Sequence, residues 1–494
     1  MMFLVRLFFD LVMGGLIAYC FRRSWNWEHG IDDDRPEKGR QTFVFTEPTL
    51  LITILLTVFV MTVLVYGKEE GFLSFMYFML SVLLVFTLYF AVLLPLMPLI
   101  RKVVSARACS VLWIVPVFIF YNLYLLFANA GLPLYNIYIP KKTAVILSIV
   151  WFTGFVLFFG YSIITHLIFK HKVKDSSYEV KNMDVDRIWN EVREKQNYNF
   201  PVKLMISSEV KSPLSMGTTK KSRKLILPDN HDADTSFFNG YSEEELRMIF
   251  SHELHHLQRS DVDTKIFFTF LKAIFWFNPL VWIASEKAIE DLELSCDEIV
   301  VCDMNDHEKK RYADLLLSEA SNGTGFTTCL SASAGVLRYR MKNLLKPPVK
   351  RKGTVLVALV FTLCLLSYGF IGFTFEKCTF KDVMEKELIY PDYNSCYVNH
   401  EIDSVIERVD LSNSAEFVEY IENLQLEKLT LVTNARTGSI IEPSYSGFLY
   451  LGFNTGFINI QGRLLEIYNY GNSRHEYYMV KNWDMEKLLS FEAS

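Results

Sequence analysis

The chain has 494 residues, of which 51% are apolar and 21% charged, and its formal net charge is −5. This length is too great for one ordinary domain, and the composition lies between that of a soluble protein and that of a pure transporter. The charge argues against a direct nucleic-acid partner, because no Lys/Arg cluster is large enough to neutralise a phosphate backbone. Eight cysteines in this length do not make a disulfide scaffold.

Six apolar runs approach the roughly 20 residues that a helix needs to cross a bilayer. They are Phe3–Cys20, Leu50–Tyr66, Phe72–Ile100, Cys109–Ala130, Ala144–Phe169 and Thr354–Thr374. The first contains Arg6 and Asp10, and a signal peptide is the alternative there. Because Asp10 interrupts the apolar core and no A-x-A-like cleavage site follows, we expect a retained helix.

Clusters of basic residues flank these runs and predict their orientation, because cytoplasmic loops are enriched in lysine and arginine. The clusters are Arg22–Arg40, Arg101–Arg107, Lys170–Lys174 and Lys346–Lys352. If all four are cytoplasmic, the spans alternate, and only Lys141 and Lys142 fall on the wrong side. The sequence thus predicts a polytopic α-helical membrane protein with extracytoplasmic N- and C-termini. Its expected parts are a membrane domain of about five helices (1–170), a cytoplasmic domain (171–353), a final transmembrane helix (354–374) and an extracytoplasmic domain (375–494).

The cytoplasmic domain begins with two expected strands, Pro201–Ile206 and Lys224–Pro228, on either side of a turn at Ser212–Gly217. A capping box follows, in which the Ser242 hydroxyl caps the Glu245 amide and the Glu245 side chain reaches back. A helix is therefore expected to start there.

Beyond this helix, the apolar stretch Ile266–Ala284 is interrupted by Asn278-Pro279. The break predicts a half-buried or membrane-surface helix pair rather than a seventh crossing. The last helix of this domain is expected to start near Ser285 and to run past Asp297.

The capped helix carries His252-Glu253-Leu254-His255-His256. His252 and His256 are four residues apart, so both imidazoles project from one face of the helix and can bind one Zn²⁺. Glu253 is placed to take a proton from metal-bound water and to return it to a leaving amine. The alternative is an exposed charged helix face, because a bare H-E-x-x-H also arises by chance.

A second helix carries four carboxylates on one stripe, at spacings of four, three and four: Glu286, Glu290, Glu293 and Asp297. Such a stripe can supply a third metal ligand, although solvated acidic faces are common. Together, the capped H-E-x-x-H helix and this acidic helix favour a zinc site.

Three motifs resemble the BlaR/MecR family of integral-membrane zinc peptidases. They are the H-E-L-H-H sequence at His252–His256 with the Asn278-Pro279 break, the E-L-S-C-D sequence at Glu293–Asp297, and the Ser-Pro-x-x-x-Gly element at Ser212–Gly217. The resemblance implies an α+β gluzincin-type domain of a multi-pass protein in a bacterial plasma membrane. It also implies that Glu293 is the third zinc ligand and that Asp297 orients a ligating histidine. Glu286 and Glu290 match nothing in the family motif, His255 lies off the ligand face, and Asp261 is a further candidate contact.

The best-known members of this family sense β-lactams through an outer penicillin-binding domain, and their proteolysis leads to loss of a cytosolic repressor of resistance genes. The present sequence departs from them, because its outer segment of 119 residues contains no S-x-x-K after Phe375. Covalent β-lactam sensing is therefore not expected. The S-x-x-K at Ser208–Lys211 belongs to the cytoplasmic domain and is interpreted as fortuitous.

The outer segment nevertheless has the pattern of a small α+β domain. The expected elements are a helix at Ser414–Leu424 and strands at Lys428–Thr433, Gly447–Phe453, Phe457–Ile460 and Leu464–Tyr468. Its 19 acidic and 10 basic residues disfavour an anionic wall or lipid partner. A disulfide between Cys378 and Cys396 is plausible in an oxidising compartment, with two free thiols as the alternative.

The leading hypothesis is a membrane zinc metalloendopeptidase in transmembrane signalling, an antirepressor-like protein. An unknown extracytoplasmic ligand would act on the outer domain, and the zinc site would cleave a cytosolic regulator, such as a transcriptional repressor, or the chain itself. One alternative is a housekeeping membrane protease. The other is a non-catalytic receptor with structural zinc, which would tend to have four protein ligands rather than three and an open position.

Overall fold

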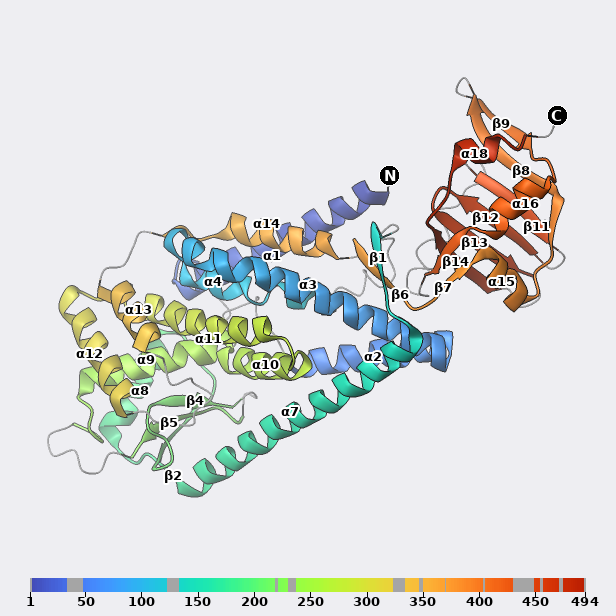
Figure 1. Cartoon of the computed structure of the whole chain (residues 1–494). Coiled ribbons are helices and arrows are strands. Elements are labelled where there is room, and N and C mark those ends of the chain that lie inside the picture. Colours follow the sequence, from blue (N-terminus) through green and yellow to red (C-terminus); the bar gives the residue numbers. More distant parts are fainter. Residues whose placement is uncertain are drawn as a thin grey trace.

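The computed structural model describes residues 2–32, 48–121, 133–217, 221–229, 237–322, 334–345, 350–368, 370–402, 405–429, 448–453, 456–470 and 474–492. Figure 1 shows a group of long helices between two other regions: a domain of helices with a small sheet, and a C-terminal domain drawn in orange and red. The sheets of these two domains have four and eight strands.

Long apolar helices make up the central region. They are α1 (Met2–Glu28), α2 (Pro48–Tyr66), α3 (Lys68–Val103), α7 (Lys141–Ser176) and α14 (Thr354–Ser367), with the shorter α4 (Ala106–Leu112), η1 (Val115–Val117) and α5 (Phe118–Tyr121). Within the described residues, α3 and α7 are long and apolar enough to cross a membrane, and each has 36 residues. Three further apolar helices are shorter, at 10–17 residues.

Two of the six predicted runs differ from single continuous helices. In the run Cys109–Ala130, α4 ends at Leu112 and a 3-10 turn containing Pro116 precedes α5, while residues 122–130 lie outside the described part. Proline has no N–H to donate to a helix, which accounts for the break. In the run Thr354–Thr374, the helix ends at Ser367, because Ile371–Thr374 forms a strand (β6) that pairs in parallel with β1 (Tyr135–Tyr138).

The two charged residues of α1 have structural partners. Arg6 is buried, and its Nη2 donates hydrogen bonds to the carbonyl oxygens of Leu365 (2.9 Å) and Leu366 (3.1 Å). These carbonyls belong to the last turn of α14, where the regular helical hydrogen bonds end and the backbone donor to Leu365 is the Tyr368 amide at the C-cap. Asp10, one turn after Arg6, lies 3.6 Å from the guanidinium. Arg6 therefore caps α14, which explains a charge inside an apolar helix.

The middle domain contains α8 (Met183–Lys195) and a sheet with the strand order β2-β3-β5-β4. The strands are β2 (Ser177–Glu179), β3 (Lys203–Ser207), β4 (Leu214–Met216) and β5 (Lys224–Pro228). The two predicted strands are confirmed as β3 and β5, which pair in parallel. The predicted turn at Ser212–Gly217 is wrong in its middle, because Leu214 pairs with Ile226 of β5 and is buried there.

Five helices complete this domain: α9 (Glu243–Arg259), α10 (Asp261–Ile274), α11 (Pro279–Val300), α12 (Asp306–Asn322) and α13 (Ala334–Leu345). The predicted capping box is confirmed at the start of α9, with both reciprocal hydrogen bonds between Ser242 and Glu245. The expected start of the next acidic helix near Ser285 is wrong, because α11 begins at Pro279. The Asn278 side chain caps the Leu280 amide, and proline is favoured in the first helical turn.

The C-terminal domain has an eight-stranded sheet with the order β7-β10-β14-β13-β12-β11-β8-β9. Its strands are β7 (Lys377–Thr379), β8 (Pro391–Ile402), β9 (Val405–Asp410), β10 (Gln425–Lys428), β11 (Phe448–Phe453), β12 (Gly456–Gln461), β13 (Leu464–Asn469) and β14 (Arg474–Val480). Three helices accompany them: α15 (Phe380–Glu387), α16 (Ala415–Glu422) and α18 (Met485–Leu489). The predicted helix is confirmed as α16, with Ser414 as its N-cap.

Three of the predicted C-terminal strands are confirmed as β11, β12 and β13. For the fourth, Lys428–Thr433, the described strand β10 ends at Lys428, and residues 430–433 lie outside the described part. The disulfide considered between Cys378 and Cys396 is not formed, and both thiols are free. Cys378 lies on β7 and Cys396 on β8, with five strands between them. At about 4.8 Å per strand, this separation is far beyond disulfide reach.

The C-terminal domain meets the long helices at an ion-pair cluster. Lys141, at the start of α7, lies 3.7 Å from Glu69 and 3.4 Å from Glu376. Lys428 of β10 similarly lies 3.7 Å from Glu70 and 3.3 Å from Glu476. Lys141 was one of the two lysines on the unexpected side of the predicted topology, and these carboxylates give it local partners.

Candidate metal centre

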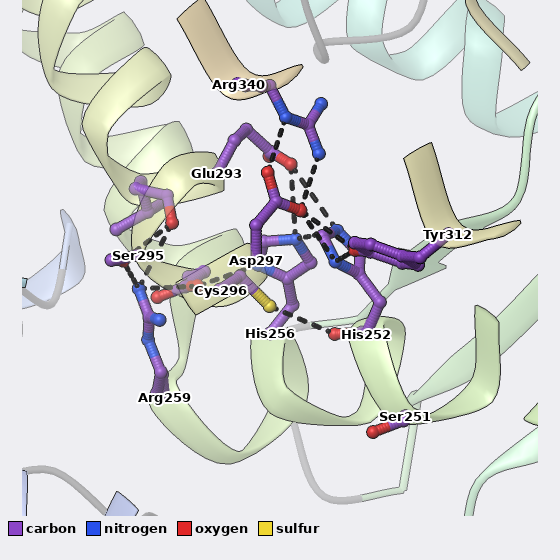
Figure 2. A network of polar contacts seen from close by, with 12 residues as sticks. Ser251, His252, His256, Arg259, Glu293, Ser295, Cys296, Asp297, Tyr312 and Arg340 are labelled. Atoms are coloured by element: carbon purple, nitrogen blue, oxygen red, sulfur yellow. Dashed lines mark hydrogen bonds and ion pairs between the residues drawn. The ribbon is translucent and has the colours of Figure 1, made fainter. Parts of the chain in front are cut away.

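The first two candidate residues lie on α9. His252 and His256 are both buried, and their Nε2 atoms face one another at 3.1 Å. Their spacing of four residues places both rings on one side of the helix, toward α11 (Figure 2).

The third candidate comes from α11. Glu293 Oε2 lies 3.5 Å from His252 Nε2 and 3.4 Å from His256 Nε2, which closes a triangle of three ligand atoms. A tetrahedral zinc ion held at about 2.1 Å separates its ligand atoms by about 3.4 Å. The three predicted ligand residues therefore come together with a spacing that fits one such ion.

The other oxygen of Glu293 has its own partner. Lys265 Nζ, on α10, donates to Glu293 Oε1 at 2.7 Å. Burial alone would raise the pKa of Glu293, but Lys265 and His256 outweigh it and hold the pKa well below its usual range. Glu293 is thus ionised, with one oxygen held by Lys265 and the other directed at the two imidazoles.

The far side of His256 is held by Asp261, a weaker candidate in the sequence. Ser260 joins α9 directly to α10 in the left-handed conformation (φ 59°), and the corner turns Asp261 back toward His256. Asp261 Oδ2 lies 2.7 Å from His256 Nδ1 and 3.2 Å from the Arg259 guanidinium. Although burial opposes ionisation, Arg259 and His256 keep the pKa of Asp261 below its usual value. The carboxylate can therefore accept a hydrogen bond from the Nδ1–H group, which leaves Nε2 facing the site.

The far side of His252 has a different arrangement. Asp297, the predicted orienting residue, lies 3.5 Å from His252 Nδ1, and the Tyr312 hydroxyl lies 2.8 Å from both Nδ1 and Asp297 Oδ1. Arg340 donates to both oxygens of Asp297, at 2.6 and 2.8 Å. Figure 2 shows Tyr312 and Arg340 meeting at this carboxylate.

Cys296 also lies near the two histidines, with His252, His256 and Cys296 ligand atoms all within 4.8 Å of one another. Its sulfur, however, lies 3.3 Å from the backbone oxygen of His252, to which the thiol donates. Burial raises the pKa of this thiol well above its usual value. A neutral thiol directed at the backbone is a poorer ligand than the ionised Glu293, whose oxygen faces the imidazoles.

Glu253 is buried beside His252 on α9, and its carboxylate makes no hydrogen bond or ion pair within the described part of the chain. A second carboxyl group, Glu319 of α12, accepts a hydrogen bond from the Tyr241 hydroxyl at 2.8 Å. Burial, together with the negative charges of Glu253 and Glu245, raises the pKa of Glu319 to about 7.

Three other residues considered in the sequence lie apart from the triangle. His255 is buried with Nε2 at 3.3 Å from the Gln196 amide nitrogen, and burial lowers its pKa to about 3. Glu290 accepts from Lys287 at 2.8 Å, and Glu286 belongs to the same outer part of the acidic stripe. Tyr312, Arg340 and Lys265 were not found from the sequence, because no local motif links them to the two histidines.

Comparisons with known proteins match the part of the chain that contains these residues. Residues 133–344 match the BlaR1 peptidase M56 family. The regulatory protein BlaR1 of Bacillus licheniformis is 30% identical over 204 residues, 39% of this chain and 32% of that protein. BlaR1 of Staphylococcus aureus is 21% identical over 354 residues, 69% of this chain and 56% of that protein. The methicillin resistance mecR1 protein of Staphylococcus aureus is 28% identical over 145 residues, 29% of this chain and 23% of that protein.

The chain thus covers less than two thirds of the length of each of these relatives. The matched segment contains every residue of the triangle, Glu253, and the partners of both histidines. Residues 133–344 are therefore a peptidase domain of the BlaR1 M56 family, and the chain as a whole is similar to proteins of the BlaR/MecR type.

Proposed function

We propose that this chain is a zinc metalloendopeptidase of a bacterial membrane that acts in transmembrane signalling. The observation that carries the proposal is the triangle of His252 Nε2, His256 Nε2 and Glu293 Oε2, with sides of 3.1–3.5 Å. Three protein ligands leave one position of a tetrahedral ion for water or substrate, as in catalytic zinc sites. A structural site would tend to have four, and the neutral Cys296 thiol does not favour that alternative.

Glu253 would be the general base. Bound zinc would supply Lewis-acid polarisation of a substrate carbonyl and would lower the pKa of a bound water. Glu253 would accept the proton from the attacking water and pass it to the leaving amine. Its lack of a cationic partner among the described residues supports this role, because an ion pair would weaken it as a base.

The membrane topology is part of the proposal. It is supported by the two 36-residue apolar helices and by the positions of the basic clusters. The peptidase domain would be cytoplasmic and both termini extracytoplasmic. Reporter fusions at Lys174, Lys350 and Ser494 test it, and a cytoplasmic signal at Ser494 would contradict the proposed number of crossings.

The proposed substrate is a cytosolic regulator, such as a transcriptional repressor, or the chain itself. The names of the relatives, a regulatory protein and a methicillin resistance protein, support a regulatory role. A ligand of the C-terminal domain would control the cleavage.

The decisive experiment compares wild-type protein with Glu253→Gln in cells and after purification. The variant keeps the side-chain volume but removes the base, so zinc content should stay at one per chain while cleavage falls by a factor of about 10² or more. Full cleavage by Glu253→Gln would exclude the proposed mechanism, and a wild-type protein without zinc would exclude the proposed metal.

A further inference from the structure

The two histidines of the candidate centre are held by different means. His256 Nδ1 meets Asp261 directly at 2.7 Å, whereas the Tyr312 hydroxyl stands between His252 Nδ1 and Asp297, 2.8 Å from each. Tyr312 is 1% exposed, so water does not replace this hydroxyl readily. The orientation of His252 therefore depends on the direction of the two hydrogen bonds that Tyr312 makes.

Arg340 fixes that direction. It approaches Asp297 through two parallel donors, Nε to Oδ2 at 2.6 Å and Nη2 to Oδ1 at 2.8 Å. A guanidinium can only donate, so both Asp297 oxygens accept from Arg340. The Tyr312 hydroxyl must then donate to Asp297, and its oxygen is left to accept from His252.

The direction of this hydrogen bond determines which nitrogen of His252 can bind the metal. If Tyr312 accepts from His252, Nδ1 is the donating nitrogen of the ring, and Nε2 is the nitrogen left to bind a metal. Nε2 is the atom that faces His256 and Glu293. A proton on Nε2 instead would block that position, because a metal needs the free lone pair.

We infer that Tyr312 and Arg340 are positioning residues for His252: together with Asp297 they fix the hydrogen bond at its Nδ1, aim its Nε2 at the metal position, and so set the zinc affinity. This inference rests on the proposed zinc function. Neither residue belongs to the segments His252–His256 or Glu293–Asp297. They come from α12 and α13, so metal binding depends on the docking of both helices.

Zinc affinity of the full-length, detergent-solubilised protein tests the inference, measured by competition with a chelator. Tyr312→Phe and Arg340→Gln should each weaken zinc binding by about 10–100-fold. Tyr198→Phe and Arg223→Gln are matched controls, because Arg223 donates to the Tyr198 hydroxyl in another buried tyrosine–arginine pair of the same domain. The controls should bind zinc like the wild type. Circular dichroism establishes that each protein is folded.

The double variant Tyr312→Phe/Arg340→Gln gives a second readout. Both substitutions act through Asp297, so their combined loss should be smaller than the product of the single losses. Wild-type affinity in both single variants would overturn the inference while leaving the zinc function intact, as would equal losses in the controls. Absence of zinc from the wild type would instead overturn the proposed function itself.

Discussion

Glu293 and Cys296 lie one turn apart on α11, and both approach the two imidazoles. The two side chains differ in charge. The Lys265 ammonium keeps Glu293 ionised, whereas burial keeps Cys296 neutral and its thiol is engaged by the His252 carbonyl. The Glu293 carboxylate is therefore the expected third ligand.

Cobalt substitution tests that choice. A thiolate bound to Co²⁺ gives an intense sulfur-to-metal charge-transfer band in the near ultraviolet, which nitrogen and oxygen ligands do not give. We expect no such band in the cobalt-loaded protein, and an unchanged visible spectrum in Cys296→Ser. Glu293→Ala should lose most of its cobalt. A charge-transfer band that disappears in Cys296→Ser would make Cys296 the ligand instead.

The pH dependence of metal binding follows from His256. Burial alone would lower the pKa of His256, but Glu293 and Asp261 raise it to about 9 in the metal-free protein. Below this pH a proton on Nε2 occupies the position that zinc requires. Zinc affinity should therefore rise by roughly tenfold per pH unit from pH 7 and level off near the His256 pKa. Calorimetry in buffers of different ionisation enthalpy should find about one proton released per zinc at pH 7.5, and no release would contradict it.

Residue spacing alone was enough to single out His252, Glu253 and His256, because four residues make one helical turn. Spacing alone could not select Glu293, because four carboxylates lie on the same stripe of the helix. The resemblance to the family made that selection. The partners Tyr312 and Arg340 lie 60 and 88 positions after His252 in the chain. Only tertiary packing brings them to Asp297, and single-sequence patterns contain no record of that packing.

Among the elements, α7 and α10 form one of the contacts between the long helices and the peptidase domain. Trp151 of α7 donates to the carbonyl of Ile274 at 2.8 Å, and Trp276 donates back to the carbonyl of Trp151 at 3.2 Å. A Cβ atom on Gly154 would lie 2.2 Å from the Trp276 ring. Since α10 begins with Asp261 and includes Lys265, this contact also supports two residues that hold the metal ligands.

Two alanine substitutions on α7 measure that contact. Gly154→Ala forces the Trp276 ring away from Trp151 and should destabilise the protein by roughly 1–3 kcal/mol. Gly160→Ala is the matched control, because no atom lies within 4 Å of a Cβ there. It should be neutral or stabilising by up to about 1 kcal/mol, as alanine favours the helix. Thermal melting of both variants checks this, and equal melting temperatures would contradict the packing.

Elements with a local signal were the ones predicted correctly. The capping box at Ser242 determines the start of α9, and alternating apolar residues between turns determine β11 to β13. The incorrect predictions lie where pairing with a distant segment determines the local structure. The segment Leu214–Met216 becomes a strand only because β5 lies beside it, and the end of α14 depends on the pairing of β6 with β1.

At the scale of the whole molecule, the C-terminal domain is attached to the long helices through charged groups. Glu427, almost fully buried, lies 3.0 Å from both Lys377 and Lys481 and accepts from the Asn136 side chain at 3.2 Å. Asn136 belongs to β1 and lies five residues before Lys141, where α7 begins. The contacts of Asn136 in β1 and of Trp151 in α7 thus connect the C-terminal domain, α7 and α10 through adjoining segments of the chain.

The C-terminal domain lacks a sequence element that acylation by a β-lactam would need. Acylation by a β-lactam requires a serine activated by a nearby base, and S-x-x-K places that pair one helical turn apart. No serine after Phe375 is followed three residues later by lysine. The described part of this domain is an antiparallel sheet with three short helices of five to eight residues. We therefore expect no covalent adduct with a β-lactam.

A fluorescent penicillin tests this expectation on membranes that contain the protein. After denaturing electrophoresis, no labelled band should appear near 57.4 kDa, the mass of the chain. Membranes with a known penicillin-binding protein serve as the positive control, and membranes without this chain identify the background bands. A labelled band that depends on this chain would require an acylated nucleophile outside the S-x-x-K pattern. The C-terminal domain would then react with β-lactams. The ligand triangle would be unaffected, because it lies in the separate peptidase domain.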